Sequence, residues 1–120
     1  MRVAIVGSRN YPCTFEVVKY VRCLPTDTTV ISGGARGVDS IAESTARILG
    51  LQTLIFLPDW EKHGKKAGFL RNIEIVKNSD RLVAFWDGES KGTLHSINLA
   101  KQSGIPVTIF DKEGNQTDGN

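Results

Sequence analysis

The chain of 120 residues contains only two cysteines. Cys13 and Cys23 are ten positions apart on one predicted helix, so they form no C-x-x-C motif, and a disulfide between them is geometrically unfavourable. This cysteine usage suits a reducing compartment, and we expect the cytoplasm. No pair of histidine, cysteine or carboxylate side chains has the spacing of metal ligands. We therefore expect no metal and no cofactor.

The chain also has little net charge and no long apolar run. Its formal charge of +2 is too small for composition alone to indicate a nucleic-acid or membrane partner. Only four apolar residues precede Gly7 after the first two positions, so we expect no targeting or membrane-spanning segment. With 40% hydrophobic and 23% charged residues, the composition is typical of one soluble globular domain.

Short apolar runs alternate with segments of helical periodicity. Strands are predicted at residues 3–6, 29–31, 53–57, 82–86 and 107–110, and helices at 13–24, 40–49, 69–78 and 94–104. Ser40 and Glu43 have the spacing of a capping box at the start of the second helix. This alternation predicts an α/β fold, a doubly wound parallel sheet of five strands with helices on both faces. The domain covers residues 1–110, and 111–120 is a polar tail.

Four polar or glycine-bearing loops each follow a predicted strand, at residues 7–10, 33–39, 58–68 and 87–93. We interpret the third of them as a long functional loop or a broken helical turn. Open parallel sheets bind ligands beyond the carboxyl ends of their strands, where the strand order reverses. If the order is 3-2-1-4-5, the loops after strands one and four meet there, and the loop after strand two lies beside them.

The loop after the second strand is the richest in glycine. It contains Gly33, Gly34 and Gly37 with Arg36, but it has neither the G-x-G-x-x-G pattern nor the lysine of a P-loop. Glycines let backbone N–H groups approach a phosphate closely, and the following helix start adds further donors. Arg36 can supply a forked donor. The alternative interpretation is a tight strand-to-helix turn with a surface arginine.

Taken together, the motifs of this chain resemble the YspA-type branch of the SLOG superfamily, which joins the Smf/DprA DNA-processing proteins to the LOG phosphoribohydrolases. The motifs are Gly7-Ser8-Arg9, the segment from Ser32 to Asp39, Arg71-Asn72, the segment from Ala84 to Gly88, and Ser90-x-Gly92-Thr93. The resemblance extends from Arg2 to Phe110. It implies a Rossmann-like fold with a pocket for a nucleotide or a nucleotide-derived ligand.

The resemblance leaves the fate of that ligand open, because the superfamily includes enzymes, DNA binders and sensors. LOG enzymes carry a Gly-Thr-x-x-Glu motif with a catalytic glutamate. In this chain Gly92-Thr93 is followed by Ser96 at the glutamate position, which weakens the phosphoribohydrolase interpretation.

The predicted site residues come from all these motifs. The ligand is expected to contact Gly7, Ser8, Arg9, Ser32, Gly33, Gly34, Ala35, Arg36, Gly37, Asp39, Arg71, Asn72, Asp87, Ser90, Gly92 and Thr93. Asp39 and Asp87 are the candidate catalytic groups, with Glu89 and His95 as further candidates. Each residue has a structural alternative: turns for the glycines, helix caps for Ser8 and Thr93, and solvated side chains for the charged residues.

Two functions from different classes compete. The first is binding of a nucleotide-derived ligand, as a sensor or as an enzyme on its N-glycosidic or phosphate end. The alternative is a DprA-like module for single-stranded DNA, which would use the basic residues of 62–71 with Trp60 stacking on a base. Trp86, on an apolar strand, is expected in the core. A third hypothesis is self-association as a homo-oligomer.

Overall fold

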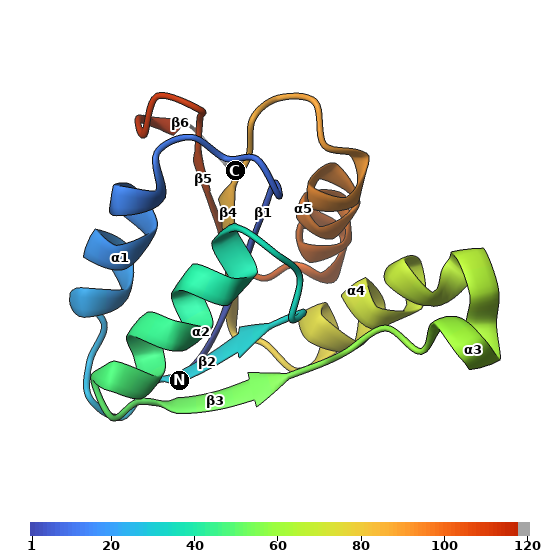
Figure 1. Cartoon of the computed structure of the whole chain (residues 1–120), viewed down its shortest axis with the longest axis horizontal. Coiled ribbons are helices and arrows are strands. Elements are labelled where there is room, and N and C mark those ends of the chain that lie inside the picture. Colours follow the sequence, from blue (N-terminus) through green and yellow to red (C-terminus); the bar gives the residue numbers. More distant parts are fainter. Residues whose placement is uncertain (118–120) are drawn as a thin grey trace.

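A central sheet of six strands has the order β3-β2-β1-β4-β5-β6 in the computed structural model, which describes residues 1–117 (Figure 1). Five of the strands are parallel: β1 (Arg2–Gly7), β2 (Thr29–Ser32), β3 (Gln52–Ile55), β4 (Arg81–Phe85) and β5 (Val107–Phe110). The strand order reverses between β1 and β4. The predicted Rossmann-like fold, with its order 3-2-1-4-5, is therefore confirmed.

The sixth strand, β6 (Gln116–Thr117), was not predicted. The polar segment after Phe110 was expected to be a tail, but it turns at Gly114, with a φ of 82°, and pairs antiparallel with β5. The Asp111 side chain holds this turn by accepting hydrogen bonds of 3.0 Å from the N–H groups of Glu113 and Asn115. The last three residues of the predicted tail, 118–120, lie outside the described residues.

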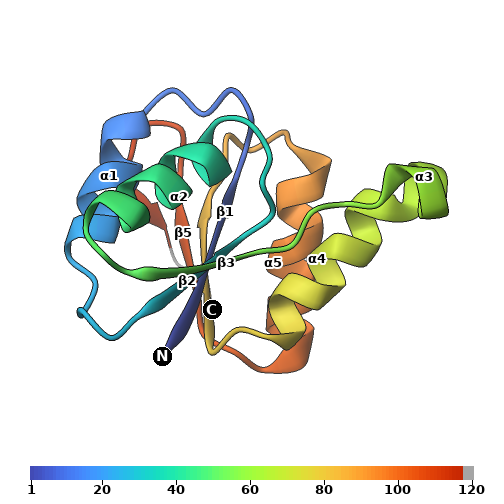
Figure 2. The same ribbon diagram turned by 60° about the horizontal axis from the view of Figure 1, so that its bottom comes forward.

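Two layers of helices cover the sheet. Helices α1 (Thr14–Arg22) and α2 (Val38–Ile48) pack on one face, and α4 (Ala67–Lys77) and α5 (Lys91–Ser103) pack on the other (Figures 1 and 2). Helix α2 begins before the predicted start at Ser40. Gly37 is its N-cap, with a φ of 79°, and no side chain caps it. The capping box of Ser40 and Glu43 was therefore a wrong prediction, because the glycine turn starts the helix earlier.

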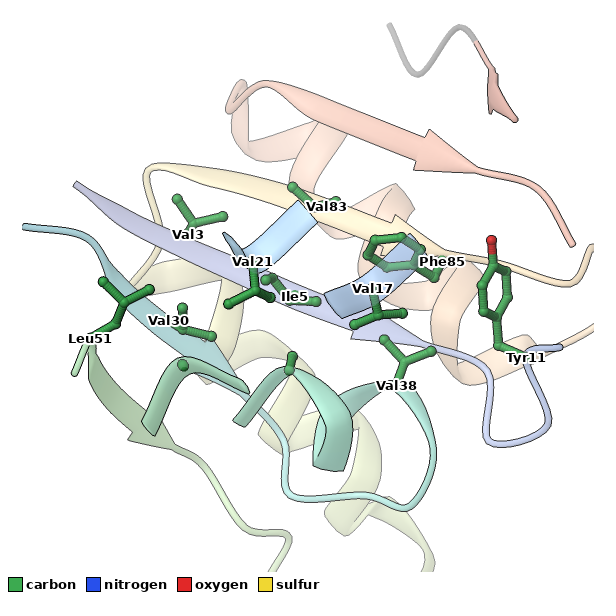
Figure 3. Close-up of a cluster of buried hydrophobic side chains, with 12 residues drawn as sticks. Val3, Ile5, Tyr11, Val17, Val21, Val30, Val38, Leu51, Val83 and Phe85 are labelled. Atoms are coloured by element: carbon green, nitrogen blue, oxygen red, sulfur yellow. The ribbon is translucent and has the colours of Figure 1, made fainter. Parts of the chain in front are cut away.

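The central strands β1, β2 and β4 bury both faces, as their continuous apolar runs predicted. Val3 and Ile5 of β1 face α1 and α2, whereas Ala4 and Val6 face α4 and α5. Figure 3 shows the first of these two core layers, the one beneath α1 and α2, in which Phe85 lies next to Tyr11. Trp86 packs against the second layer and donates a 3.0 Å hydrogen bond from Nε1 to the carbonyl oxygen of Ser90.

The segment between β3 and α4 contains two short helical turns after the irregular residues 56–59, which agrees with the broken-helix interpretation. They are α3 (Trp60–His63) and the 3₁₀ turn η1 (Gly64–Lys66), and they project from the body of the molecule (Figure 2). Asp59 caps α3 by accepting a 3.1 Å hydrogen bond from the N–H of Lys62. No helix within residues 1–117 is long and apolar enough to cross a membrane.

Candidate functional site

A pocket of about 450 Å³ lies at the carboxyl ends of β1 and β4, where the strand order reverses. We call it the first pocket. The predicted site residues that line it are Gly7, Ser8, Arg9, Ala35, Asp39, Arg71, Asn72, Asp87, Ser90, Gly92 and Thr93. They come from three loops, from the first turns of α2 and α5, and from the second turn of α4. The fold thus gathers residues that are up to 86 positions apart, from 7 to 93, around one hollow.

A second pocket of about 390 Å³ adjoins the first. Arg9, Ala35 and Arg71 line both pockets. The second pocket also has Gly33, Gly34 and Arg36 from the predicted set, together with Leu57, Pro58 and Trp60. The β2–α2 loop therefore contributes to both pockets.

Two predicted site residues, Ser32 and Gly37, line neither pocket. Ser32 is fully buried in β2, and its hydroxyl has no hydrogen-bond partner among the described residues. At Gly37, a β-carbon would overlap the backbone carbonyl of Arg9. This glycine allows the β1–α1 and β2–α2 loops to touch, which is the turn alternative rather than ligand contact.

Gly7 also has a packing role. A β-carbon at this position would lie 2.5 Å from Cγ2 of Val38 and 2.7 Å from the carbonyl oxygen of Phe85. Real β-carbons do not come so close to other atoms, so Gly7 lets the start of α2 pack directly on β1. The same residue lines the first pocket, and its two roles are compatible.

Gly92, the second residue of α5, is different. Within the described part of the chain, apart from its two neighbours and the backbone of its own helix, nothing lies within 4 Å of the place where its β-carbon would be. Its backbone does not require glycine either, since its φ is outside the left-handed region. Alanine is a better helix former than glycine by up to about 1 kcal/mol. Neither packing nor backbone conformation thus explains a glycine at this place in the first pocket.

Asp39 is the most perturbed acidic group of the first pocket. Its side chain is only 5% exposed, and one oxygen, Oδ2, accepts 3.2 Å hydrogen bonds from the N–H groups of Gly33 and Ala35. Burial raises the pKa of Asp39 to about 6, although these two hydrogen bonds and the charge of Arg71 lower it. A carboxyl group with such a pKa can hold or release a proton near neutral pH.

Arg71 connects the loop after β2 with α4 and α5. Its guanidinium donates to the carbonyl oxygen of Gly33 from one NH group, and its Nε donates to Oδ1 of Asn72 at 3.0 Å. Asn72 in turn donates to the carbonyl oxygen of Gly92 at 3.3 Å and lies 3.2 Å from Nδ1 of His95. Burial lowers the pKa of Arg71, and the Asp39 carboxylate acts in the opposite direction. This network fixes the common wall of the two pockets.

Asp87 and Ser90 organise the start of α5. Oδ1 of Asp87 accepts 2.9 Å hydrogen bonds from the N–H groups of Glu89 and Ser90. Burial alone would raise the pKa of this half-buried carboxyl, but the hydrogen bonds that it accepts, led by those from the Glu89 and Ser90 backbone, outweigh burial, so the pKa is lowered. Ser90, not Thr93, is the N-cap residue of α5, and its hydroxyl accepts a 3.3 Å bond from the N–H of Thr93.

Ser8 links the loop after β1 to the loop after β4. Its hydroxyl accepts a 3.2 Å hydrogen bond from the N–H of Asp87, so it does not cap the first helix. The side chain is buried, at 1% exposure. Ser8 therefore holds together the two loops that meet at the reversal of strand order.

Four residues of the first pocket were not predicted as site residues: Val6, Asn10, Ile75 and Ser96; Glu89, predicted only as a further catalytic candidate, lines it too. Asn10 and Glu89 lie in loops that were predicted to carry the site, so loop position was the available signal. Ser96 donates from its hydroxyl to the carbonyl oxygen of Gly92 at 3.4 Å, one helical turn earlier. Ile75 belongs to the apolar stripe of its helix and gave no separate signal.

The aromatic and basic residues expected for nucleic-acid contact lie beside the second pocket. Trp60 is 53% exposed and lines this pocket. Lys62, His63, Lys65 and Lys66 are exposed on the projecting α3–η1 segment. The pocket and this segment share Trp60, so the basic side chains follow directly after one wall of the pocket.

The chain is similar in sequence to a known family and to a phage protein. The family model described as YspA, cpYpsA-related SLOG family matches residues 1–63. Gene 61 protein of Mycobacterium phage D29 is 45% identical, and the match covers 91% of this chain and 95% of that protein.

Two solved structures of DNA processing protein A (DprA) share the fold. The Helicobacter pylori protein, whose single-stranded DNA binding mode was described, has a TM-score of 0.79 and 22% identity over 99% of this chain and 69% of that protein. The Streptococcus pneumoniae protein has a TM-score of 0.78 and 20% identity, with 92% of this chain covered. This chain spans about half of the pneumococcal protein, 49%.

Proposed function

The chain belongs to the YspA, cpYpsA-related SLOG family, and on that premise we propose that its first pocket binds a nucleotide or a nucleotide-derived ligand. The observation that carries the proposal is the set of groups that converge at the reversal of strand order. Arginine side chains, hydroxyl groups and a buried carboxyl line one hollow beside the start of a helix. This combination suits a ligand that carries both phosphate and ribose.

The start of α5 is the proposed phosphate position. The first N–H groups of a helix have no partner within the helix, and they carry its positive partial charge. Gly92 leaves open space at this place, and Thr93 and Ser90 supply hydroxyl groups beside it. Arg9 and Arg71 line the same pocket and add forked donors. Asp39 and Asn72 are the proposed partners of ribose hydroxyl groups.

The same pocket offers one carboxyl suited to proton transfer. Asp39, with its pKa raised to about 6, is the proposed acid or base if the ligand is hydrolysed. Asp87 holds the turn before α5, and its lowered pKa keeps it ionised. Release of free base from nucleoside monophosphates, measured by chromatography, separates an enzyme from a sensor. Loss of that release in Asp39→Asn would assign the proton transfer.

The test of binding uses two matched glycines. Gly92 and Gly68 are each the second residue of a helix, and neither has a left-handed backbone. We expect Gly92→Ala and Gly68→Ala both to raise the unfolding midpoint, because alanine favours a helix by up to about 1 kcal/mol. Only Gly92→Ala should weaken the ligand at least tenfold, because its methyl group occupies the phosphate position.

The measurement is the thermal midpoint against nucleoside monophosphates, cyclic nucleotides, ADP-ribose and short single-stranded DNA, since a ligand of the folded state raises the midpoint. A nucleotide that raises the midpoint of the wild type and of Gly68→Ala, but not of Gly92→Ala, supports the proposal. If no member of the panel raises the midpoint, or if Gly92→Ala responds like the wild type, the proposal is refuted.

A second candidate function is binding of single-stranded DNA through the α3–η1 segment. The observation that favours it is the cluster of exposed basic side chains next to the half-exposed Trp60. Such binding is strongly salt-dependent, because each neutralised phosphate releases counterions. An affinity for oligonucleotides that falls steeply with salt, and that is lost when Lys62, Lys65 and Lys66 are changed to glutamine, would favour it. Self-association stays a prediction.

A further inference from the structure

The two adjoining pockets suggest a ligand with two parts. We propose that the site takes a dinucleotide: one nucleotide in the first pocket, the other in the second pocket with its base on Trp60, and the linking phosphate at Arg9 and Arg71. The inference rests on the proposed function, since it extends the ligand of the first pocket into the second. It names the ligand class that neither the family nor the fold specifies.

The shared wall makes one continuous site of the two pockets. Arg9, Ala35 and Arg71 line both, and the hollows measure about 450 and 390 Å³. Each is therefore within the size range of a small-molecule site. The hydrogen bonds from Arg71 to the carbonyl oxygen of Gly33 and to Asn72 fix this side chain at the boundary. The Arg71 side chain can therefore contact a ligand in the first pocket and a ligand in the second pocket.

The charges of the two pockets differ. The charged residues of the first pocket are Arg9 and Arg71 together with Asp39, Asp87 and Glu89. Those of the second are Arg9, Arg36 and Arg71, without a carboxylate. Within residues 1–117, no carboxylate oxygen lies within 4.0 Å of these three guanidinium groups. An anionic group gains most at the arginine boundary and in the second pocket, which is where the linking phosphate of a dinucleotide would lie.

The outer wall of the second pocket is apolar and aromatic. Trp60 is 53% exposed, and Leu57 beside it in the pocket lining is 70% exposed. The indole lies beside the start of α4, since a β-carbon at Gly68 would make an ordinary van der Waals contact of 3.6 Å with the Trp60 ring. An exposed indole next to three arginines suits a nucleobase whose phosphate lies on the arginine side. Stacking of one base on an aromatic ring strengthens binding by about tenfold or more.

The test compares dinucleotides with mononucleotides in titration calorimetry at one ionic strength. The probes are AMP with pApA, UMP with pUpU, and the decanucleotide pA₁₀. We expect at least one dinucleotide to bind about tenfold or more tightly than its mononucleotide. Trp60→Leu should reduce this advantage to less than threefold without changing the mononucleotide affinity, and Trp60→Phe should retain most of it.

Two further variants complete the design. Arg36→Gln should also reduce the dinucleotide advantage, because Arg36 lines only the second pocket. Phe15→Leu is the control, since it removes an aromatic ring that is 71% exposed on α1 and that lines neither pocket. It should leave every affinity unchanged.

The outcomes separate this inference from the proposed function. If a mononucleotide binds in a manner sensitive to Gly92→Ala but its dinucleotide binds no more tightly, the dinucleotide inference is overturned and the proposed function remains. If pA₁₀ binds more than tenfold more tightly than pApA, the strand continues beyond the two pockets, and the inference is overturned in favour of the DNA-binding candidate. If no probe binds, both proposals are overturned.

Discussion

The buried carboxyl of Asp39 leads to a prediction about stability and pH. The substitution Asp39→Asn removes the charge but keeps an oxygen that can accept the two hydrogen bonds from Gly33 and Ala35, since both donate to the same Oδ2 atom. The pKa of Asp39 is raised from 3.8 to about 6 in the folded protein, chiefly by burial. The folded state thus holds this proton more tightly than the unfolded state.

The sign and size of the effect follow from this shift. Because the unfolded chain loses the proton first as the pH rises, the wild type loses stability between the unfolded and the folded pKa. A shift of about two units corresponds to about 3 kcal/mol in total, of which about 2 kcal/mol falls between about pH 4.5 and about pH 7.5. The asparagine variant does not titrate, so its stability relative to the wild type should rise by about 2 kcal/mol over this interval.

The assay is urea unfolding of both proteins at about pH 4.5 and about pH 7.5, with the free energy of unfolding extrapolated to water. Asp59→Asn is the control, because it removes the same charge at an exposed N-cap, where asparagine is as good a cap as aspartate. A stability difference between wild type and Asp39→Asn that is equal at the two pH values would refute the argument. A loss of stability of Asp39→Asn relative to the wild type as the pH rises would also refute it.

Two further predictions follow from the contacts around the pockets. Gly7→Ala should destabilise the fold by about 1–3 kcal/mol, because its methyl group would be forced against Val38 and the carbonyl of Phe85. Urea unfolding measures this loss. A free energy of unfolding within about 0.5 kcal/mol of the wild type would contradict the prediction. Arg71→Lys keeps the charge but removes the guanidinium group, which donates hydrogen bonds to both the Gly33 carbonyl oxygen and the Asn72 side chain. We expect a loss of about 1–2 kcal/mol in the same assay and weaker binding in the first pocket, and an unchanged unfolding curve would show that the fork is dispensable.

Much of the fold could be predicted because the central strands β1 and β4 bury both faces. Runs such as residues 3–6 and 82–86 have no polar position, which indicated a parallel sheet covered by helices on both sides. Strand β6 gave no such signal, because Gln116 and Thr117 are exposed and polar. Its pairing depends on the turn that Asp111 stabilises through two backbone N–H groups, a contact that composition does not reveal.

The position of the candidate site could be predicted, but its separation into two adjoining pockets could not. The reversal of strand order between β1 and β4 brought the expected loops together, as their place after the strands indicated. The sequence did not reveal that Arg71, from a distant helix, forms the wall between two pockets. It also could not distinguish Gly37, which a loop contact requires, from Gly92, which nothing in the described fold requires. That distinction depends on atoms far away in the sequence.

Two features at this edge of the sheet work against stability. Asp39 is a buried carboxyl that burial drives toward protonation, and Gly92 is a helical glycine whose β-carbon would meet open space. Natural proteins depart from local stability rules mainly where function requires it. Both residues line the first pocket, and the adjoining second pocket is lined by three arginines. The two departures therefore favour a bound anion and its hydroxyl-bearing partner as the reason for this arrangement.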